Sequence, residues 1–239
     1  MVTVTRAAFL LDFDGTLVDI APAPDQVRVA PGLVEDLRRL LGLCGEALAI
    51  VSGRPIAQIE AFLPQAAHAI SGEHGTAIRR APASPIEWLS LPPTPQGWRA
   101  AAQALERSHP GVVLEDKTYG FVLHYRATPD AGHTIRAALE DMLRDAANGY
   151  KLAEAKMAWE VRPSGADKGA AVQALMAQPP FAGRIPLFVG DDATDEDGMR
   201  EARALGGIGL RVGEAFADAA AVRAWIARLA AGQESAWPA

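Results

Sequence analysis

The sequence predicts an α/β protein in which helices wind around a parallel sheet, with a segment of α+β style inserted into this core. Short apolar runs that end at turns alternate with longer segments whose apolar residues recur every three or four positions. Such alternation of strands and helices is typical of a parallel sheet. This style occupies both ends of the chain, whereas the middle has the pattern of helices and hairpins. We therefore predict that the middle is an insertion.

Residues 7–11 form the first apolar run, and because a turn bounds it we predict a short buried strand there. A loop punctuated by prolines follows over residues 18–30. Pro55 stands where proline suits the start of a helix. The remaining elements expected in this part are a helix over 32–43 with its leucines on one face, a strand over 48–51, a helix after Pro55 and a strand over 66–70.

Prolines crowd residues 82–95, which show no clean hydrophobic period, so a linker between domains is predicted there. The elements expected beyond it are helices from residue 97 and over 131–146, and strands over 112–114, 121–125, 151–153 and 158–161. After Lys168 the first style returns, with a helix, a strand over 185–189, a second helix, a strand over 208–212 and a helix over 216–230. The predicted organisation is a core of residues 1–93 and 165–239 and an insertion of residues 94–164.

Composition limits the possible partners. The 239 residues fit one large domain or two small ones, and the hydrophobic share of 49% is ordinary for a globular protein. A net charge of −6 gives no electrostatic reason to expect nucleic acid or an anionic membrane. The single cysteine, Cys44, excludes an internal disulfide and is predicted to be a buried apolar residue. No signal peptide or membrane span is recognised, so we expect a cytoplasmic protein.

Two carboxylates, Asp12 and Asp14, follow the first predicted strand. Side chains two residues apart at the end of a strand point to the same side, so these groups are expected to meet in one crevice. Two carboxylates that close repel each other, and their burial is costly unless a cation or a proton is shared. A hard divalent ion such as Mg²⁺ suits such a pair. The alternative is a solvated turn.

Further polar clusters follow other strands. Ser52 and Arg54 follow the strand predicted over 48–51, and the segment 190–197 after another strand holds five carboxylates in eight positions. Because parallel α/β sheets place their sites at the carboxyl ends of the strands, these groups are expected to converge. Each of these residues also has a structural alternative to a role in the site. Ser52 is then a helix cap, Lys168 is a solvated surface residue, and Asp192 and Asp195 are first-turn acids that stabilise a helix N-terminus.

These motifs occur in the order found in haloacid dehalogenase-like phosphatases, and the flanking residues resemble one branch, the trehalose-6-phosphate phosphatases. The resemblance spans nearly the whole chain, from Asp12 to about Gly213, although Met199 stands where an aromatic residue is expected. The segments that carry it are Asp12-x-Asp14-Gly15-Thr16, Ser52-Gly53-Arg54-Pro55, Glu73-His74-Gly75, Glu115-x-Lys117, His124-Tyr125-Arg126, Glu160-Val161-Arg162-Pro163, Asp167-Lys168-Gly169 and Gly190-Asp191-Asp192-Ala193-Thr194-Asp195-Glu196.

The resemblance implies a role for each core motif. Asp12 is expected to attack phosphorus, and Asp14 to transfer the proton of the leaving group. Ser52 and Lys168 are expected to hold the phosphoryl oxygens. The implied Mg²⁺ ligands are Asp12, Asp14 (through its backbone carbonyl) and Asp191, with Asp192 and Asp195 as auxiliary carboxylates, and the implied substrate contacts of the core are Gly15, Thr16, Gly53 and Arg54.

The insertion is expected to act as a cap that selects the sugar and excludes water. The resemblance assigns sugar binding to Glu115, Lys117, Arg126 and Glu160, with Arg162 as a further candidate. Within each of the pairs Glu115/Lys117 and Glu160/Arg162 the spacing of two places both side chains on one side of a strand. The alternative is a set of salt bridges on a solvated sheet face. His74 is expected to be a structural residue and not a metal ligand.

The implied function is Mg²⁺-dependent hydrolysis of trehalose 6-phosphate to trehalose and phosphate. The alternatives are a phosphatase for sucrose phosphate or mannosylglycerate phosphate, a phosphosugar mutase, and a catalytically silent sugar-phosphate sensor. A silent sensor is expected to lack Asp12 or Asp14, and both are present. The expected partner is therefore a small sugar phosphate, with no nucleic acid or membrane, and the protein is expected to be a monomer or a weak homo-oligomer.

Overall fold

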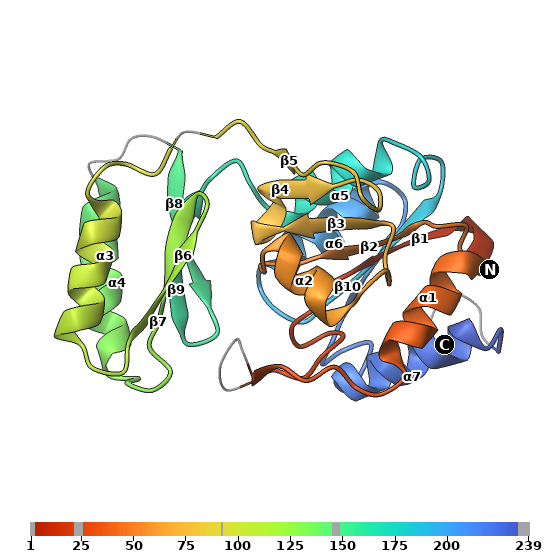
Figure 1. Cartoon of the computed structure of the whole chain (residues 1–239), viewed down its shortest axis with the longest axis horizontal. Coiled ribbons are helices and arrows are strands. Elements are labelled where there is room, and N and C mark those ends of the chain that lie inside the picture. The colour runs from red at the N-terminus through yellow and green to blue at the C-terminus, as the bar shows by residue number, and fades with distance from the viewer. Residues whose placement is uncertain (1–2, 22–25, 92, 145–148, 234–239) are drawn as a thin grey trace. The chain divides into compact units, whose positions relative to one another are not determined.

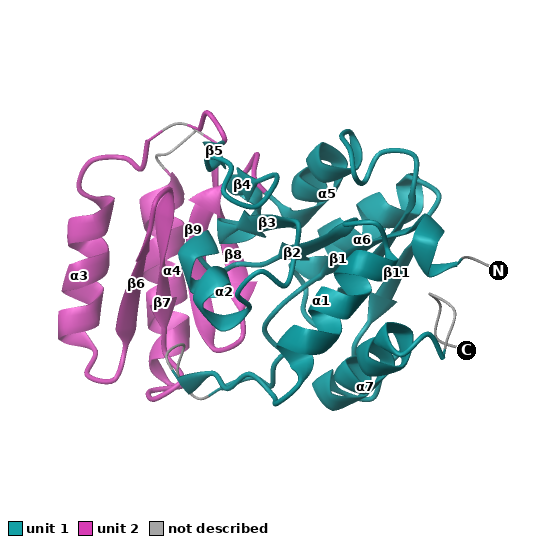
Figure 2. Ribbon diagram, turned by 45° about the vertical axis from the view of Figure 1, so that its right-hand side comes forward, with its two compact units in different colours: residues 1–88, 167–239 teal, residues 89–166 magenta. Residues whose placement is uncertain are grey.

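The chain forms two sheets that belong to two separate units (Figure 2). The computed structural model describes residues 3–21, 26–91, 93–144 and 149–233. The first unit comprises Met1–Trp88 and Asp167–Ala239, and the second comprises Leu89–Ala166. The second unit is thus inserted into the sequence of the first, with boundaries a few residues from the predicted 94–164.

The sheet of the first unit has seven strands in the order β11-β10-β1-β2-β3-β4-β5. Its parallel strands are β1 (Ala7–Leu11), β2 (Leu48–Val51), β3 (Ala69–Gly72), β10 (Ile185–Gly190) and β11 (Ile208–Arg211). Two short antiparallel strands, β4 (Ala77–Arg79) and β5 (Glu87–Trp88), extend one edge. Two short 3₁₀ helices, η1 (Val4–Arg6) and η3 (Glu73–Gly75), also belong to the unit.

Helices cover both faces of this sheet (Figure 1). The core of one face contains residues of α1 (Leu33–Leu43), α2 (Ile56–Phe62) and α7 (Ala219–Ala230). The other core contains residues of α5 (Lys168–Met176) and α6 (Asp195–Ala204). Successive side chains of β1 alternate between the two cores, which buries the whole strand and explains its uninterrupted apolar run.

The strand order has the topology that favours a crevice at the carboxyl ends of the strands. From β1 the chain continues to β2 on one side, and it later returns to β10 on the other. The connections on either side of β1 therefore run in opposite directions, and such a switch in strand order leaves a crevice at the carboxyl ends of the strands. Residues that follow β1, β2 and β10 are placed at that edge.

The second unit is a four-stranded antiparallel sheet with two helices on one face (Figure 1). Its core consists mainly of residues of α3, α4 and the strand side chains that face them, among them Phe121, Leu123 and Val161. The elements are α3 (Trp98–Ser108), β6 (Val113–Lys117), β7 (Gly120–His124), α4 (Ala131–Arg144), β8 (Tyr150–Ala155) and β9 (Ala158–Pro163).

The predicted fold class is confirmed, and the strands predicted over 7–11 and 48–51 have the observed bounds. The strand predicted over 66–70 begins later, at Ala69, and the last helix begins at Ala219, after Asp218 accepts a hydrogen bond from the Ala221 N–H. Strands β4 and β5 were missed. The predicted helix over 131–146 ends among residues that lie outside the described part of the chain, as does Pro92 of the predicted linker. Within the described part, no helix is long and apolar enough to cross a membrane.

Trp225 of α7 provides a test of the packing. Its side chain is fully buried, with its ring centroid 6.0 Å from that of Phe9 and 5.3 Å from that of Phe216. Its indole N–H has no hydrogen-bond partner in the described part of the chain. We predict that Trp225→Ala lowers the free energy of unfolding by about 3–5 kcal/mol, because a large cavity forms.

Trp225→Phe is the matched control. It retains a ring and removes the unpaired N–H, so its cost is expected to be well below that of Trp225→Ala. Urea unfolding of the three proteins compares them. Equal losses for both variants would contradict this description of the core.

Candidate active site

A buried lysine lies between two buried carboxylates at the carboxyl edge of the first sheet. The Nζ of Lys168 donates hydrogen bonds to Oδ1 of Asp12 at 2.7 Å and to Oδ1 of Asp195 at 2.6 Å. The exposed fractions of the three residues are 3% for Asp12, 3% for Lys168 and 0% for Asp195. The plain alternative of a solvated Lys168 is therefore wrong.

The local structure explains how these side chains meet. The backbone N–H of Asp12 donates to the carbonyl of Val189, which extends the pairing of β1 with β10 by one residue. Lys168 is the first residue of α5, where Asp167 caps the helix by accepting a hydrogen bond from the N–H of Ala170. The cap fixes the start of the helix, and with it the point from which the lysine side chain extends.

The cluster carries more negative than positive charge. Burial raises the pKa of Asp12 well above its ordinary value, and the charge of Asp195 adds to this effect while Lys168 opposes it. Burial likewise raises the pKa of Asp195. For Lys168, burial favours the neutral amine, but the two carboxylates outweigh it and raise the pKa. An additional cation would relieve this excess of negative charge.

Three carboxylates offer a place for such a cation. One carboxylate oxygen from each of Asp12, Asp191 and Asp195 lies within 4.8 Å of the others. Oxygen ligands of this kind fit a hard divalent ion. In the described part of the chain, the side chain of Asp192 does not belong to this group. The ligand predicted for Asp14 is its backbone carbonyl, which stays a prediction.

Gly15 lies against the carboxylate of Asp191 in this group. Its φ of +78° lies in the left-handed region, and a Cβ atom here would be 2.1 Å from Oδ2 of Asp191. Only glycine allows the Asp191 carboxylate to approach the loop this closely. The next residue, Thr16, is fully buried, and its hydroxyl has no hydrogen-bond partner in the described part of the chain.

The side chain of Asp14, whose expected metal ligand is its backbone carbonyl, makes an ion pair. Its two carboxylate oxygens accept hydrogen bonds from Arg54, from Nε at 2.6 Å and from Nη2 at 2.8 Å. This is a bidentate pair between groups 40 residues apart in the sequence. Asp14 and Arg54 were predicted to lie at one site, but their ion pair was not predicted.

Ser52 follows β2 and is 1% exposed. It does not cap α2, whose first turn has no side-chain cap. Its Oγ accepts a hydrogen bond from the N–H of Arg54 at 3.1 Å, so the hydroxyl proton is left to be donated to another group. Gly53 is in close contact with the ring of His74, since a Cβ on Gly53 would be 2.4 Å from Nε2.

Asp192 organises the loop that leads into α6. Its Oδ1 accepts hydrogen bonds from the N–H and the hydroxyl of Thr194 and from the N–H of Asp195. Burial opposes its ionisation, but the charge of Lys168 and these hydrogen bonds hold the pKa of Asp192 below its ordinary value. Oδ2 of Asp195 accepts from the N–H groups of Asp191 and Asp192. The acidic run therefore stabilises its own loop, as one of the plain alternatives anticipated, in addition to forming the cluster.

In the second unit, Glu115 lies between two donors. Its Oε1 is 2.7 Å from Nζ of Lys117, and its Oε2 is 2.9 Å from Nε2 of His124. Burial alone would raise the pKa of Glu115, but the hydrogen bonds and charges of His124 and Lys117 hold it at about 2. His124 was not predicted as a site residue, whereas its neighbour Tyr125 packs in the core, as expected of one of the two.

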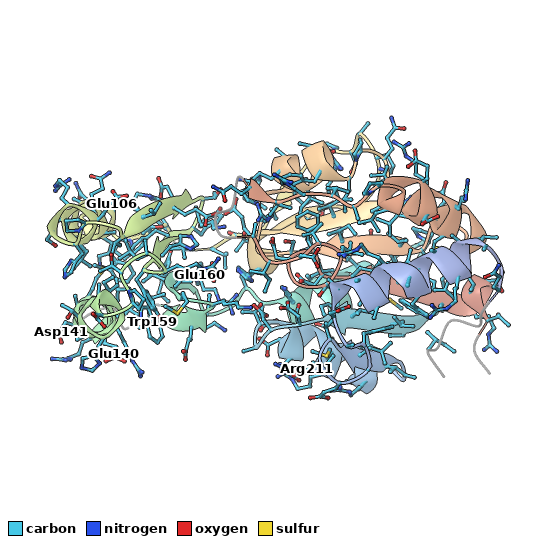
Figure 3. The ribbon with its side chains drawn as sticks, turned by 90° about the horizontal axis from the view of Figure 1, so that it is seen from below. Glu106, Glu140, Asp141, Trp159, Glu160 and Arg211 are labelled. Carbon is cyan, nitrogen blue, oxygen red and sulfur yellow. The ribbon has the colours of Figure 1, made fainter. Side chains whose placement is uncertain are left out.

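Glu160 and Arg162 are two residues apart on β9, with Nε of Arg162 3.9 Å from Oε2 of Glu160. Figure 3 labels Glu160 and its neighbour Trp159, whose ring belongs to the core on the opposite face of the sheet. The register aligns Glu115 with Val122, and Val122 with Glu160, so the two acids lie on one face. Arg126 lies beyond the end of β7 and donates to the carbonyl of Lys156 at 3.4 Å.

The parallel sheet and its acidic cluster define the core of a haloacid dehalogenase-like phosphatase. A family model described as trehalose-phosphatase matches residues 10–217, and the chain belongs to that family. The "Probable trehalose-phosphate phosphatase" of Sinorhizobium fredii is 38% identical over 206 residues, which cover 86% of this chain and 77% of the relative. The "Trehalose-6-phosphate phosphatase" of Escherichia coli is 34% identical over 212 residues, covering 87% and 78%.

Solved structures show the same fold. The C-terminal domain of the trehalose-6-phosphate phosphatase of C. albicans superposes with a TM-score of 0.80 at 24% identity, covering 96% of this chain and 93% of that one. The sucrose-phosphatase from Synechocystis sp., solved in complex with sucrose and phosphate, gives a TM-score of 0.59 at 17% identity, covering 93% and 97%. At these identities the likeness concerns the fold.

Gly15→Ala tests the close approach of Asp191. The variant is expected to displace the Asp191 carboxylate and to weaken the stabilisation of the protein by a divalent cation. Gly183→Ala is a matched control, because Gly183 also has a φ of +78° but no atom within 4 Å of the position of a Cβ. Both variants bear the same backbone strain, about 1–2 kcal/mol.

The measurement is the rise in melting temperature on adding MgCl₂, which reports binding to the folded state. The rise is expected to persist in Gly183→Ala and to shrink in Gly15→Ala. An equal rise in both variants would show that Asp191 is not needed for the cation.

Proposed function

We propose that this protein is an Mg²⁺-dependent phosphatase that hydrolyses trehalose 6-phosphate to trehalose and inorganic phosphate. The observation that carries the proposal is the convergence of Asp12, Lys168, Asp195 and Asp191 at the sheet edge, in a chain of the trehalose-phosphatase family. A buried nucleophile beside a cation is suited to a dianionic phosphate ester.

In the proposed first step, a carboxylate oxygen of Asp12 bonds to phosphorus while the bond from phosphorus to the sugar oxygen breaks. Lys168 already donates to Oδ1 of Asp12. Because Lys168 contacts Oδ1, we assign the attack to the other oxygen, Oδ2. Asp14 gives its proton to the departing sugar oxygen, which would otherwise leave as an unstable alkoxide.

In the proposed second step, a water oxygen attacks the phosphorus of the aspartyl-phosphate. The proton of that water passes to Asp14, the bond between Asp12 and phosphorus breaks, and inorganic phosphate is released. The chemistry thus divides one difficult displacement into two and restores both carboxyl groups. Ser52 has a hydroxyl proton to donate to a phosphoryl oxygen in either step.

Asp12, Asp191 and Asp195 are proposed to hold the Mg²⁺ through their carboxylates. The backbone carbonyl of Asp14 is proposed as a further ligand. When bound, the ion supplies charge that offsets the repulsion between the nucleophile and the phosphate. The side chain of Asp192 is assigned to the loop itself, since its Oδ1 accepts three hydrogen bonds from Thr194 and Asp195.

The second unit is proposed to be the cap that recognises the sugar. Its sheet has one face covered by helices, and the other face carries the charged residues Glu115, Lys117, Glu160 and Arg162. Ionised side chains make strong hydrogen bonds to neighbouring sugar hydroxyls. A pKa of about 2 keeps Glu115 ionised at neutral pH, which suits a hydrogen-bond acceptor. Arg126 is proposed to contribute from the end of β7.

Phosphate release from a panel of esters tests the proposal. We predict that the native protein with MgCl₂ prefers trehalose 6-phosphate over sucrose 6-phosphate, glucose 6-phosphate and p-nitrophenyl phosphate, and that a chelator abolishes the activity. Asp12→Asn keeps the shape of the side chain but lacks the nucleophile, so we expect a loss of about 10³-fold or more.

The outcomes separate the alternatives. Preference for sucrose 6-phosphate would contradict the assignment of trehalose 6-phosphate as the substrate, but it would agree with the proposed type of reaction. Full activity of Asp12→Asn would contradict the assignment of Asp12 as the nucleophile. If the native protein released no phosphate from any ester with MgCl₂, the enzymatic proposal would be wrong and a sensor would remain.

A further inference from the structure

The guanidinium of Arg54 binds Asp14 and contacts several other side chains. Both oxygens of Asp14 accept hydrogen bonds from it, at 2.6 and 2.8 Å, and its Nη1 donates to Oε1 of Gln58 at 3.2 Å. The guanidinium carbon lies 5.6 Å from the ring centroid of Phe13 and 5.7 Å from that of Phe62. Stacked rings and a second acceptor restrict the side chain to one arrangement.

The backbone of Arg54 is fixed as well. Its N–H donates to Oγ of Ser52, and its carbonyl accepts the N–H of Glu73. Glu73 and its neighbour His74 have φ values of 47° and 54°, a left-handed conformation that non-glycine residues adopt only where the surrounding contacts impose it. The turn that presents Arg54 is thus built as part of the site and not as an adaptable surface loop.

Asp14, in contrast, has few other restraints on its side chain. Its backbone forms a bridge with Val18, and the next residue, Gly15, donates its N–H to the Val18 carbonyl. This leaves the two side-chain torsions of Asp14 to be set by its hydrogen bonds. The side chain is 37% exposed, against 12% for Arg54, so the more exposed partner is held by the better anchored one.

We propose that Arg54 is a positioning residue that orients the carboxyl group of Asp14 for its proton transfer to and from the reacting oxygen. This inference rests on the proposed function, and it replaces the expectation that Arg54 contacts the substrate. Arg54 acts through Asp14, and the fork geometry of the guanidinium is required because two parallel hydrogen bonds fix both the direction and the plane of the carboxylate.

The leaving group provides a specific readout. A sugar oxygen needs the proton of Asp14 when its bond to phosphorus breaks, whereas p-nitrophenolate is stable enough to leave without it. Misplacing Asp14 is therefore expected to slow the sugar ester selectively. The ratio kcat/KM is the quantity to compare, because it covers only the steps up to the departure of the leaving group.

The experiment measures kcat/KM of the native protein, Arg54→Met and Arg54→Lys for trehalose 6-phosphate and p-nitrophenyl phosphate with MgCl₂. Met retains the apolar contact with the rings, and Lys retains the charge without the fork. Arg80→Met is the control, since Arg80 forms an ion pair with Glu87 at 2.8 Å and is not part of the candidate site. We expect both Arg54 variants to lose about 100-fold on the sugar ester, little on the aryl ester, and Arg80→Met to behave as the native protein.

The same comparison in an Asp14→Asn background completes the test. If Arg54 acts through Asp14, then Arg54→Met causes no further selective loss there. An equal loss on both esters, or a selective loss that persists without Asp14, would overturn the inference and return Arg54 to a direct or purely structural role. Full activity of Arg54→Met on the sugar ester would also overturn it.

A crystal structure of Arg54→Met gives a reading that does not depend on activity. The Asp14 carboxylate is expected to leave the position that it has in the native protein, and an unmoved Asp14 would contradict the inference. Failure of the proposed function is distinguishable from either result, because it is absence of Mg²⁺-dependent phosphate release by the native protein itself.

Discussion

The first unit depends on one buried ammonium group, that of Lys168, which is shared by two carboxylates. Lys168 contacts Asp12 and Asp195 at hydrogen-bond distance, and all three side chains are almost completely removed from water. Charges are costly to bury, and removal of one partner leaves the others uncompensated. Burial of the cluster therefore costs free energy, and this cost is offset only while the three side chains remain in contact. Its surplus of negative charge is also what makes a divalent cation a suitable additional member.

The fold brings the members together from distant parts of the sequence. Asp12 and Lys168 are 156 residues apart, and the second unit lies between them in the chain. The strand order places β1 beside β10, so that the residues following these strands share one edge. The helix α5 begins at Lys168, immediately after the chain returns from the insertion. An insertion at this point lengthens the chain without altering the sheet edge on which the cluster depends.

The fold class and many elements could be predicted because local patterns determine them. Fully apolar runs such as 7–11 and 48–51 are bounded by turns and become buried parallel strands. Strands β4 and β5 were missed, because a three-residue and a two-residue strand carry no period. The contact between Asp14 and Arg54 could not be predicted, since nothing in a sequence pattern relates two side chains 40 residues apart beyond their placement at one edge. His124 was missed for a similar reason, because its partnership with Glu115 depends on the register of β6 and β7.

The central claim is that Lys168 is the shared counter-charge of Asp12 and Asp195 in one buried unit, and urea unfolding of Lys168→Met tests it most directly. The claim predicts a loss of about 3–5 kcal/mol in the free energy of unfolding, because two buried carboxylates lose their counter-charge. It also predicts that the double variant Lys168→Met/Asp195→Asn recovers part of that loss, because one of the uncompensated charges is removed. Native stability in Lys168→Met, or a double variant that loses the full sum of the single losses, would contradict the claim.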